Sequence, residues 1–401
     1  MNQSTLTSPE NANWNYPTHI LFGVNRVNEL SAICHNKHMK NPLMVTDFGL
    51  ANFEFIKAIK TDLKQSKINC AIFCEVKANP NSLNISQGVI AYNAGGHDGV
   101  IAIGGGSALD AGKAIALMVG QSHSIWDFED VGDNWLKVNE RNMAQVIAIP
   151  TTAGTGSEVG RASVIVDEEQ HLKKIIFHPK MLPATVILDP ALSQDLPAHL
   201  TAATGLDAFV HSLEAYCAPG YHPMAEGIAI QAMILIKTWL PIAFENGSNL
   251  EARGHMLTAS CMGATAFQKG LGGVHALAHP LGAIFDKHHG LLNAIVLPYV
   301  LMKNRPAIEE KINELCVFLS INKTPKQTAF EAFMDWVVGF RSAFGIPNSL
   351  QEIGIAEKDA KRIGEMAFAD PSAQGNPLPL SPQEYGEIFV SAVKGDLHFA
   401  Q

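Results

Sequence analysis

The stretch Gly99-Val100-Ile101-Ala102-Ile103-Gly104-Gly105-Gly106-Ser107 joins a short apolar run directly to three glycines and a serine. The residues that follow it, 108–118, are mostly helix formers. We therefore predict a buried strand, a glycine turn and a helix, in that order. Backbone N–H groups in such a turn can approach a diphosphate because no Cβ stands in the way, and the helix dipole favours an anion. The alternative is a tight strand-to-helix turn that binds nothing.

The glycine turn matches neither of the two common phosphate-binding fingerprints. Leu109 stands where G-x-G-x-x-G needs its third glycine, and no G-K-[ST] closes the loop. A second polar loop, P-T-T-A-G-T-G-S-E over 150–158, also follows a predicted strand and suits contacts to a ribose or a nicotinamide amide. Asp47 ends another predicted strand and is the type of carboxylate that binds a ribose diol and repels a 2′-phosphate. The alternative for Asp47 is a capping or turn residue.

The glycine turn belongs to a half of the chain in which short apolar runs alternate with helical patterns. We predict helices over 53–66 and 84–94, and extra strands or a hairpin at 20–22 and 163–166. The main strands are predicted at 42–45, 70–73, 99–103, 145–149 and 185–188. Such βαβ units assemble into a mostly parallel sheet, which predicts a Rossmann-like α/β domain over 1–189. Beyond residue 190 strand-like runs nearly vanish, so 190–401 is predicted to be an all-α domain.

The composition excludes several classes of protein. The chain has 401 residues, 38 acidic and 29 basic side chains and a formal charge of −9, so a nucleic-acid partner is not expected. No apolar run approaches the roughly 18 residues of a membrane helix, and the N-terminus lacks the layout of a secretory signal. The six cysteines are scattered and predict no disulfide framework. We therefore expect a cytoplasmic protein without a membrane partner.

The second half concentrates histidines in apolar, glycine-rich surroundings. Asp207 and His211 stand four residues apart on one face of a predicted helix, His275 and His279 repeat this spacing, and His289 follows closely. An unpaired polar group in such surroundings costs about 1–3 kcal/mol, so we expect these side chains to bind a common partner. Imidazoles with one carboxylate predict a divalent transition metal. For each histidine alone, the alternative is a hydrogen-bonded core or surface residue.

These motifs, in this order, resemble the iron-containing (group III) alcohol dehydrogenase family over nearly the whole chain, starting from 17–22. They are G-G-G-S-A-L-D over 104–110, P-T-T-A-G-T-G-S-E over 150–158, T-A-A-T-G-L-D-A over 201–208 and H-A-L-A-H-P-L-G over 275–282. The resemblance implies the two-domain fold that this family shares with dehydroquinate synthase. It also implies a homodimer.

Site residues follow from the same resemblance. It implies that His279 takes part in proton transfer beside the nicotinamide. The implied metal ligands are Asp207, His211, His275 and His289. The implied dinucleotide contacts are Asp47, Asn79, Gly104, Gly105, Gly106, Ser107, Thr151, Thr152, Thr155 and Lys174. The family usually has proline where His288 stands, but the spacing from His275 favours His289 as the ligand.

The expected function is metal-dependent hydride transfer between NAD(H) and a small primary or secondary alcohol, aldehyde or ketone. Iron is the expected metal and zinc the alternative, because nitrogen and oxygen ligands serve both. Asp47 favours NAD over NADP. Three other functions remain open: a polyol dehydrogenase, a hydroxy-acid or semialdehyde reductase, and a non-catalytic dinucleotide- or metal-binding regulator. A lyase similar to dehydroquinate synthase is opposed by the motifs at 201–208 and 275–282.

Overall fold

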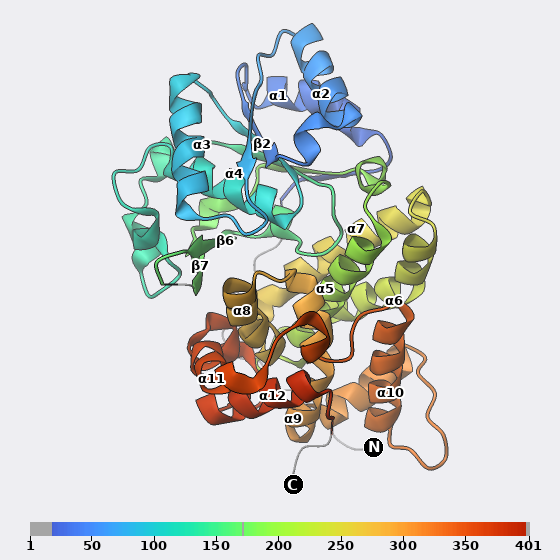
Figure 1. The fold of residues 1–401 in the computed structure, drawn as a ribbon. Coiled ribbons are helices and arrows are strands. Elements are labelled where there is room, and N and C mark those ends of the chain that lie inside the picture. Colours follow the sequence, from blue (N-terminus) through green and yellow to red (C-terminus); the bar gives the residue numbers. More distant parts are fainter. Residues whose placement is uncertain (1–17, 171, 398–401) are drawn as a thin grey trace. The chain divides into compact units, whose positions relative to one another are not determined.

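The computed structural model describes residues 18–170 and 172–397, which form two compact units (Figure 1). One unit holds the described residues up to Leu196 together with Gly247–Leu257, and the other holds Pro197–Asn246 and the described residues from Thr258 onward. The first unit thus ends a few residues beyond the boundary expected at 189/190. Nothing in the sequence indicated that 247–257 would join it. The buried Arg253 accounts for this grouping, because its guanidinium donates to the carbonyl oxygens of Gln194 and Leu196 at 3.4 and 3.0 Å.

A six-stranded sheet with the order β1-β8-β5-β4-β2-β3 forms the centre of the first unit, and its strand pairs are all parallel. Its strands are β1 (Ile20–Phe22), β2 (Leu43–Asp47), β3 (Ala71–Val76), β4 (Val100–Gly104), β5 (Val146–Pro150) and β8 (Thr185–Leu188). The strands β4, β5 and β8 are buried along their whole length, as continuous apolar runs in a parallel sheet require. The five main predicted strands all lie here, and the predicted fold class is confirmed.

Helices connect these strands in the expected alternation. They are α1 (Leu30–Asn36), α2 (Glu54–Gln65), α3 (Ser82–Ala94) and α4 (Gly106–Met118). The apolar residues Ile56, Ile59 and Leu63 recur on one face of α2 and pack into the core of this unit. The helix α4 is buried over most of its length, which explains its small, apolar sequence.

The two short segments of uncertain type have different structures. Residues 20–22 form β1, a strand at one edge of the sheet that pairs parallel with β8, rather than part of a hairpin. Residues 163–166 lie in β6 (Ala162–Asp167), which pairs antiparallel with β7 (Leu172–Phe177) in a separate hairpin. The strand β7 was not predicted, because most of it is only partly buried and its sequence L-K-K-I-I-F lacks a continuous apolar run.

The order of the strands reverses between β2 and β4, where ligands bind in open α/β sheets. Asp47 ends β2, and Gly104 ends β4 with a φ of 144° that favours glycine. A Cβ at Gly104 would lie 3.6 Å from Asp47 Oδ2, so the two predicted site positions are close together. On the other side, Thr151 N–H donates to Gly104 O at 2.9 Å and brings the two glycine-containing loops together.

The second unit is helical, and no strand follows Leu188 in the described residues. Its helices are α5 (Ala198–Cys217), α6 (Pro223–Glu245), α7 (Leu250–Ala266), whose first part belongs to the other unit, α8 (Gly273–Phe285), α9 (His289–Phe318), α10 (Ala329–Ala343), α11 (Ala360–Ala369) and α12 (Pro382–Lys394). The helix α5 is buried from Thr201 to Cys217 and packs against α6 and α9, while α8 packs against α9 and α11. These central helices carry the predicted metal ligands.

The helix α6 is the one described helix that is long and apolar enough to cross a membrane by length and composition. A third of its most apolar window is buried, and it packs against α5. Core helices of soluble proteins meet the same criterion, so this property is weak support for a membrane span.

Candidate functional site

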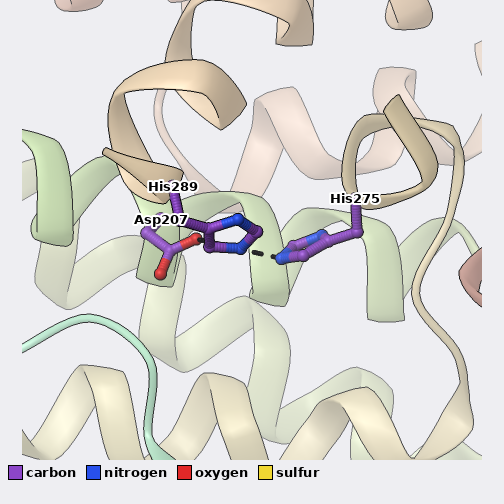
Figure 2. Close-up of side chains that lie close together, drawn as sticks. All are labelled: Asp207, His275 and His289. Carbon is purple, nitrogen blue, oxygen red and sulfur yellow. Dashed lines mark ion pairs between the residues drawn. The ribbon is translucent and has the colours of Figure 1, made fainter. Parts of the chain in front are cut away.

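Three helices bring the predicted metal ligands together in the helical unit. Asp207 and His211 lie one turn apart on α5, His275 lies in the first turn of α8, and His289 begins α9. Figure 2 shows the side chains of Asp207, His275 and His289 pointing toward one another. Of the two adjacent histidines, His289 reaches this cluster, whereas His288 is exposed.

All three imidazoles approach one carboxylate oxygen. The Nε2 atoms of His211, His275 and His289 lie 4.0, 3.8 and 3.7 Å from Asp207 Oδ1. Neighbouring ligands of a tetrahedral zinc ion are about 3.4 Å apart for bond lengths near 2.1 Å. The ligand atoms of Asp207, His275 and His289 all lie within 4.8 Å of one another. These three ligand atoms are therefore close enough to share one cation after a small contraction, whereas His211 lies outside this group, with its Nε2 4.0 Å from Asp207 Oδ1.

The protonation of this cluster also fits a cation. His275 Nδ1 lies 2.6 Å from Glu214 Oε2, so this nitrogen donates and Nε2 keeps a lone pair toward Asp207. Burial lowers the pKa of His275, but the charge of Glu214 and its hydrogen bond, together with the charges of Asp207 and Asp370, outweigh this effect and the pKa lies above its ordinary value. Three imidazoles, of which His289 is partly exposed, and one buried carboxylate suit iron or zinc. The residues present thus fit a divalent transition metal.

Asn293 completes the surroundings of the cluster. It lies one turn after His289 on α9 and is fully buried. Its Nδ2 donates to Asp207 Oδ1 at 2.6 Å and lies 3.2 and 3.1 Å from the Nε2 atoms of His275 and His289. Asn293 therefore orients the carboxylate of Asp207.

The remaining histidine of this region, His279, has a carboxylate partner of its own. Its Nδ1 lies 2.8 Å from Asp370 Oδ2, and both residues are buried. The ring of His279 stacks on that of His289, with centroids 5.4 Å apart and an interplanar angle of 14°. Burial opposes the ionisation of Asp370, but the charge of His279 holds the pKa of this carboxyl below its usual value. His279 thus lies beside the proposed metal ligands, and its own contact with Asp370 holds its ring in place.

Most of the predicted dinucleotide residues lie at the carboxyl ends of β2, β4 and β5, whereas Asn79 follows β3 and Lys174 lies on β7. The first residues of α4 are Gly106 and Ser107, and the Ser107 hydroxyl donates to the carbonyl oxygen of Ala78, next to Asn79. A Cβ at Gly105 would lie 3.5 Å from Thr152, and one at Gly106 would clash with Thr155. The two loops are therefore in contact through the predicted glycines and threonines.

Two charged residues of α4 hold the second loop in place. The carboxylate of Asp110 accepts from Ser157 Oγ at 2.6 Å and from Val164 N at 3.0 Å. The fully buried Lys113 donates to Ser157 O at 2.8 Å and also to the carbonyl oxygen of Ala162. Burial raises the pKa of Glu158, at the end of this loop, to about 7. These contacts hold the backbone of the loop against α4.

Two lysines that could bind an anionic ligand already have carboxylate partners. Lys174 lies on β7, with its ammonium 3.1 Å from Asp167 and 3.6 Å from Glu129. Lys269 pairs with Glu226 at 2.6 Å, and only 2% of its side chain is exposed. Asp47 accepts from Leu50 N at 2.9 Å, so it also has the turn role that is one alternative for this residue.

Sequence reasoning missed the carboxylates that support the histidines. Glu214 lies on the same face of α5 as Asp207 and His211, and this helical spacing was the available signal. Asp370 carried no such signal, because its contact with His279 forms only in the folded chain.

A parallel α/β unit with a glycine turn at its switch point, in one chain with a helical unit that gathers a carboxylate and three imidazoles, defines a metal-dependent, dinucleotide-linked oxidoreductase. Residues 17–190 match the family described as iron-containing alcohol dehydrogenase, and 201–393 match the C-terminal part of the same family. The chain belongs to the iron-containing alcohol dehydrogenase family.

Individual relatives cover the chain almost completely. The NAD-dependent methanol dehydrogenase of Bacillus methanolicus is 33% identical over 384 residues, which are 95% of this chain and 100% of the relative. The 1,3-propanediol dehydrogenase of Klebsiella pneumoniae is 35% identical over 376 residues, which are 92% and 96% of the two chains. A crystal structure of a 1,3-propanediol oxidoreductase has a TM-score of 0.90 and 34% identity, and the match covers 95% of this chain and 100% of that one.

Proposed function

We propose that this protein is an NAD-dependent alcohol dehydrogenase that uses one ferrous ion to interconvert small primary alcohols and aldehydes. The observation that carries the proposal is the approach of three imidazole Nε2 atoms to a single oxygen of Asp207, within 4.0 Å. In this proposal the cation is held by Asp207, His211, His275 and His289. Zinc is the alternative metal, since the same ligands bind it.

Bound at these sites, the divalent cation supplies Lewis-acid activation of the alcohol hydroxyl and NAD⁺ supplies the hydride acceptor. The protein supplies binding, orientation and a path for the proton. Asp370 holds the Nδ1 side of the His279 ring, so His279 Nε2 is the atom available to exchange a proton with the substrate or a ribose hydroxyl. The catalytic assignment of His279 rests on this arrangement and on the family's pattern.

The dinucleotide is proposed to bind at the carboxyl ends of β2, β4 and β5. The backbone of Gly104, Gly105, Gly106 and Ser107 would hold the diphosphate, because these residues open the helix α4. The residues proposed to contact the rest of the dinucleotide are Asp47, Asn79, Thr151, Thr152, Thr155 and Lys174. Asp47 at the end of β2 would accept hydrogen bonds from the ribose diol and disfavour a 2′-phosphate, which selects NAD over NADP.

The substrate is proposed to be a short, uncharged alcohol. Relatives of about one third identity bear names of enzymes for methanol and 1,3-propanediol, and one of 33% identity is a 4-hydroxybutyrate dehydrogenase from Cupriavidus necator. A hydroxy acid would need a cation beside the site, and Lys269, one candidate for that cation, is paired with Glu226. We further propose a cytoplasmic homodimer, as the family resemblance implies.

The proposal is tested by His275→Ala together with an assay of NADH formation over a panel of short alcohols. The variant is expected to lose bound metal and turnover while it binds NADH with the affinity of the wild-type protein. Methanol, ethanol, 1,3-propanediol and 4-hydroxybutyrate, each with NAD⁺ and NADP⁺, resolve the substrate and the cofactor. Full activity of the metal-free variant, or no turnover of any alcohol by the iron-loaded wild-type protein, would contradict the proposal.

A further inference from the structure

The first turn of α8, which carries His275, is held by a carboxylate from α5. Glu214 lies two helical turns after Asp207, and its side chain is only 8% exposed. Its Oε1 accepts from Val274 N–H at 2.7 Å, and its Oε2 lies 2.6 Å from His275 Nδ1. One buried carboxylate thus binds both the backbone and the side chain of adjacent residues.

A second side chain binds the same turn without touching His275. Asn376 Oδ1 accepts from Gly273 N–H at 2.9 Å and from Asn304 Nδ2 at 2.8 Å. A Cβ at Gly272 would lie 3.0 Å from Glu214 Oε1, so glycine allows this close approach. The helix N-terminus therefore has two side-chain acceptors, of which only Glu214 also reaches an imidazole.

The contact between Glu214 and His275 determines which ring nitrogen carries the proton. A carboxylate can only accept, so the proton of a neutral His275 ring lies on Nδ1. The lone pair then lies on Nε2, which is 3.8 Å from Asp207 Oδ1. In other metalloproteins a carboxylate behind a histidine ligand fixes its tautomer and raises its basicity.

We propose that Glu214 is a positioning residue of the metal centre, which fixes the ring orientation and the tautomer of His275 through Nδ1 while it caps the first turn of α8. This inference rests on the proposed function, because it requires that His275 be a metal ligand. The role of Glu214 thus differs from that of Asn376, which caps the same helix but does not contact His275.

The test is the affinity of the metal-free full-length protein for Zn²⁺, measured by competition with a chelator. Glu214→Gln can still accept from Val274 N–H through its amide oxygen, but its NH₂ group donates toward His275 Nδ1. That reversal moves the proton to Nε2, the atom that faces Asp207. We expect the dissociation constant for Zn²⁺ to rise roughly 10- to 100-fold, with an unfolding midpoint of the metal-free protein close to that of the wild type.

Asn376→Ala is the matched control, because it removes a cap of the same turn and leaves the contact between Glu214 and His275 intact. It is expected to lower the unfolding midpoint of the metal-free protein and to change Zn²⁺ affinity much less than Glu214→Gln. Wild-type affinity in Glu214→Gln, or an equal loss of affinity in Asn376→Ala, would overturn the inference and leave the proposed function intact. A wild-type protein that binds no Zn²⁺ would contradict the proposed function, and the inference would fall with it.

If Glu214→Gln does not fold, a measurement on the wild-type protein tests the proposed role of Glu214. Nitrogen-15 NMR of the Zn²⁺-loaded protein is expected to show the His275 proton on Nδ1. A proton on Nε2, with Nδ1 bound to the metal, would overturn the inference.

Discussion

Gly290 lies where α9 packs against α5. Replacing it by alanine tests whether the proposed metal ligands depend on this close packing. A Cβ at this position would lie 2.3 Å from Ala203 O, 2.9 Å from Ala203 C and 3.1 Å from Asp207 Cβ. Reaching an ordinary contact with the carbonyl oxygen requires a shift of about 1 Å. His289 is adjacent to Gly290, so this shift moves a proposed ligand much further than the roughly 0.2 Å that metal geometry tolerates.

We therefore expect Gly290→Ala to lower the free energy of unfolding by about 1–3 kcal/mol, the usual cost of overpacking. Its affinity for Zn²⁺ or Fe²⁺ should fall at least about tenfold, the lower bound for disturbing the surroundings of a ligand. Gly339→Ala in α10 is the matched control, since no atom lies within 4 Å of its added Cβ. It should stabilise the protein by about 0.5–1 kcal/mol. If Gly290→Ala has the metal affinity and stability of the wild-type protein, measured by chelator competition and urea unfolding, the proposed contact between this position and the ligands is wrong.

Three further predictions concern other parts of the site. His279→Ala should keep its metal but lose roughly 100-fold or more in kcat, because a proton-transfer group is removed; an unchanged kcat would exclude this role. Asp47→Ser should lower KM for NADP⁺ by about tenfold or more, since like-charge repulsion costs several kcal/mol, and kinetics that still exclude NADP⁺ would count against Asp47. Burial raises the pKa of Glu158 from 4.5 to about 7, so the folded state favours the protonated form and wild-type stability is lost as pH rises through this window. Glu158→Gln should therefore match the wild-type protein near pH 4 and be more stable by roughly 3 kcal/mol above pH 7; a pH-independent difference in urea unfolding would show that this burial effect is absent.

Features with a local sequence pattern could be predicted. The strand β4, the glycine turn and α4 follow from a buried apolar run and helix formers on either side of three glycines. Asp207 and His211 were assigned to one face of a helix because their spacing matches its period. Buried strands in a parallel sheet and helical faces leave this kind of periodic signal in the chain itself.

Features that depend on contacts between residues distant in the sequence could not be predicted. The half-buried, lysine-containing β7 resembles a surface segment until it pairs with β6. Asp370 contacts His279, and Arg253 joins its segment to Gln194, only after the chain has folded. No local pattern marks such partners, so their roles emerge from the structure alone.

We propose that one divalent cation, held by Asp207 and three histidines, is required for NAD-dependent alcohol oxidation. The most direct test is the rate of NADH formation from a short primary alcohol by protein stripped of metal anaerobically, before and after a single equivalent of Fe²⁺ is added. We expect no measurable rate in the stripped protein and recovery of the rate when iron is added. An undiminished rate without metal would contradict it.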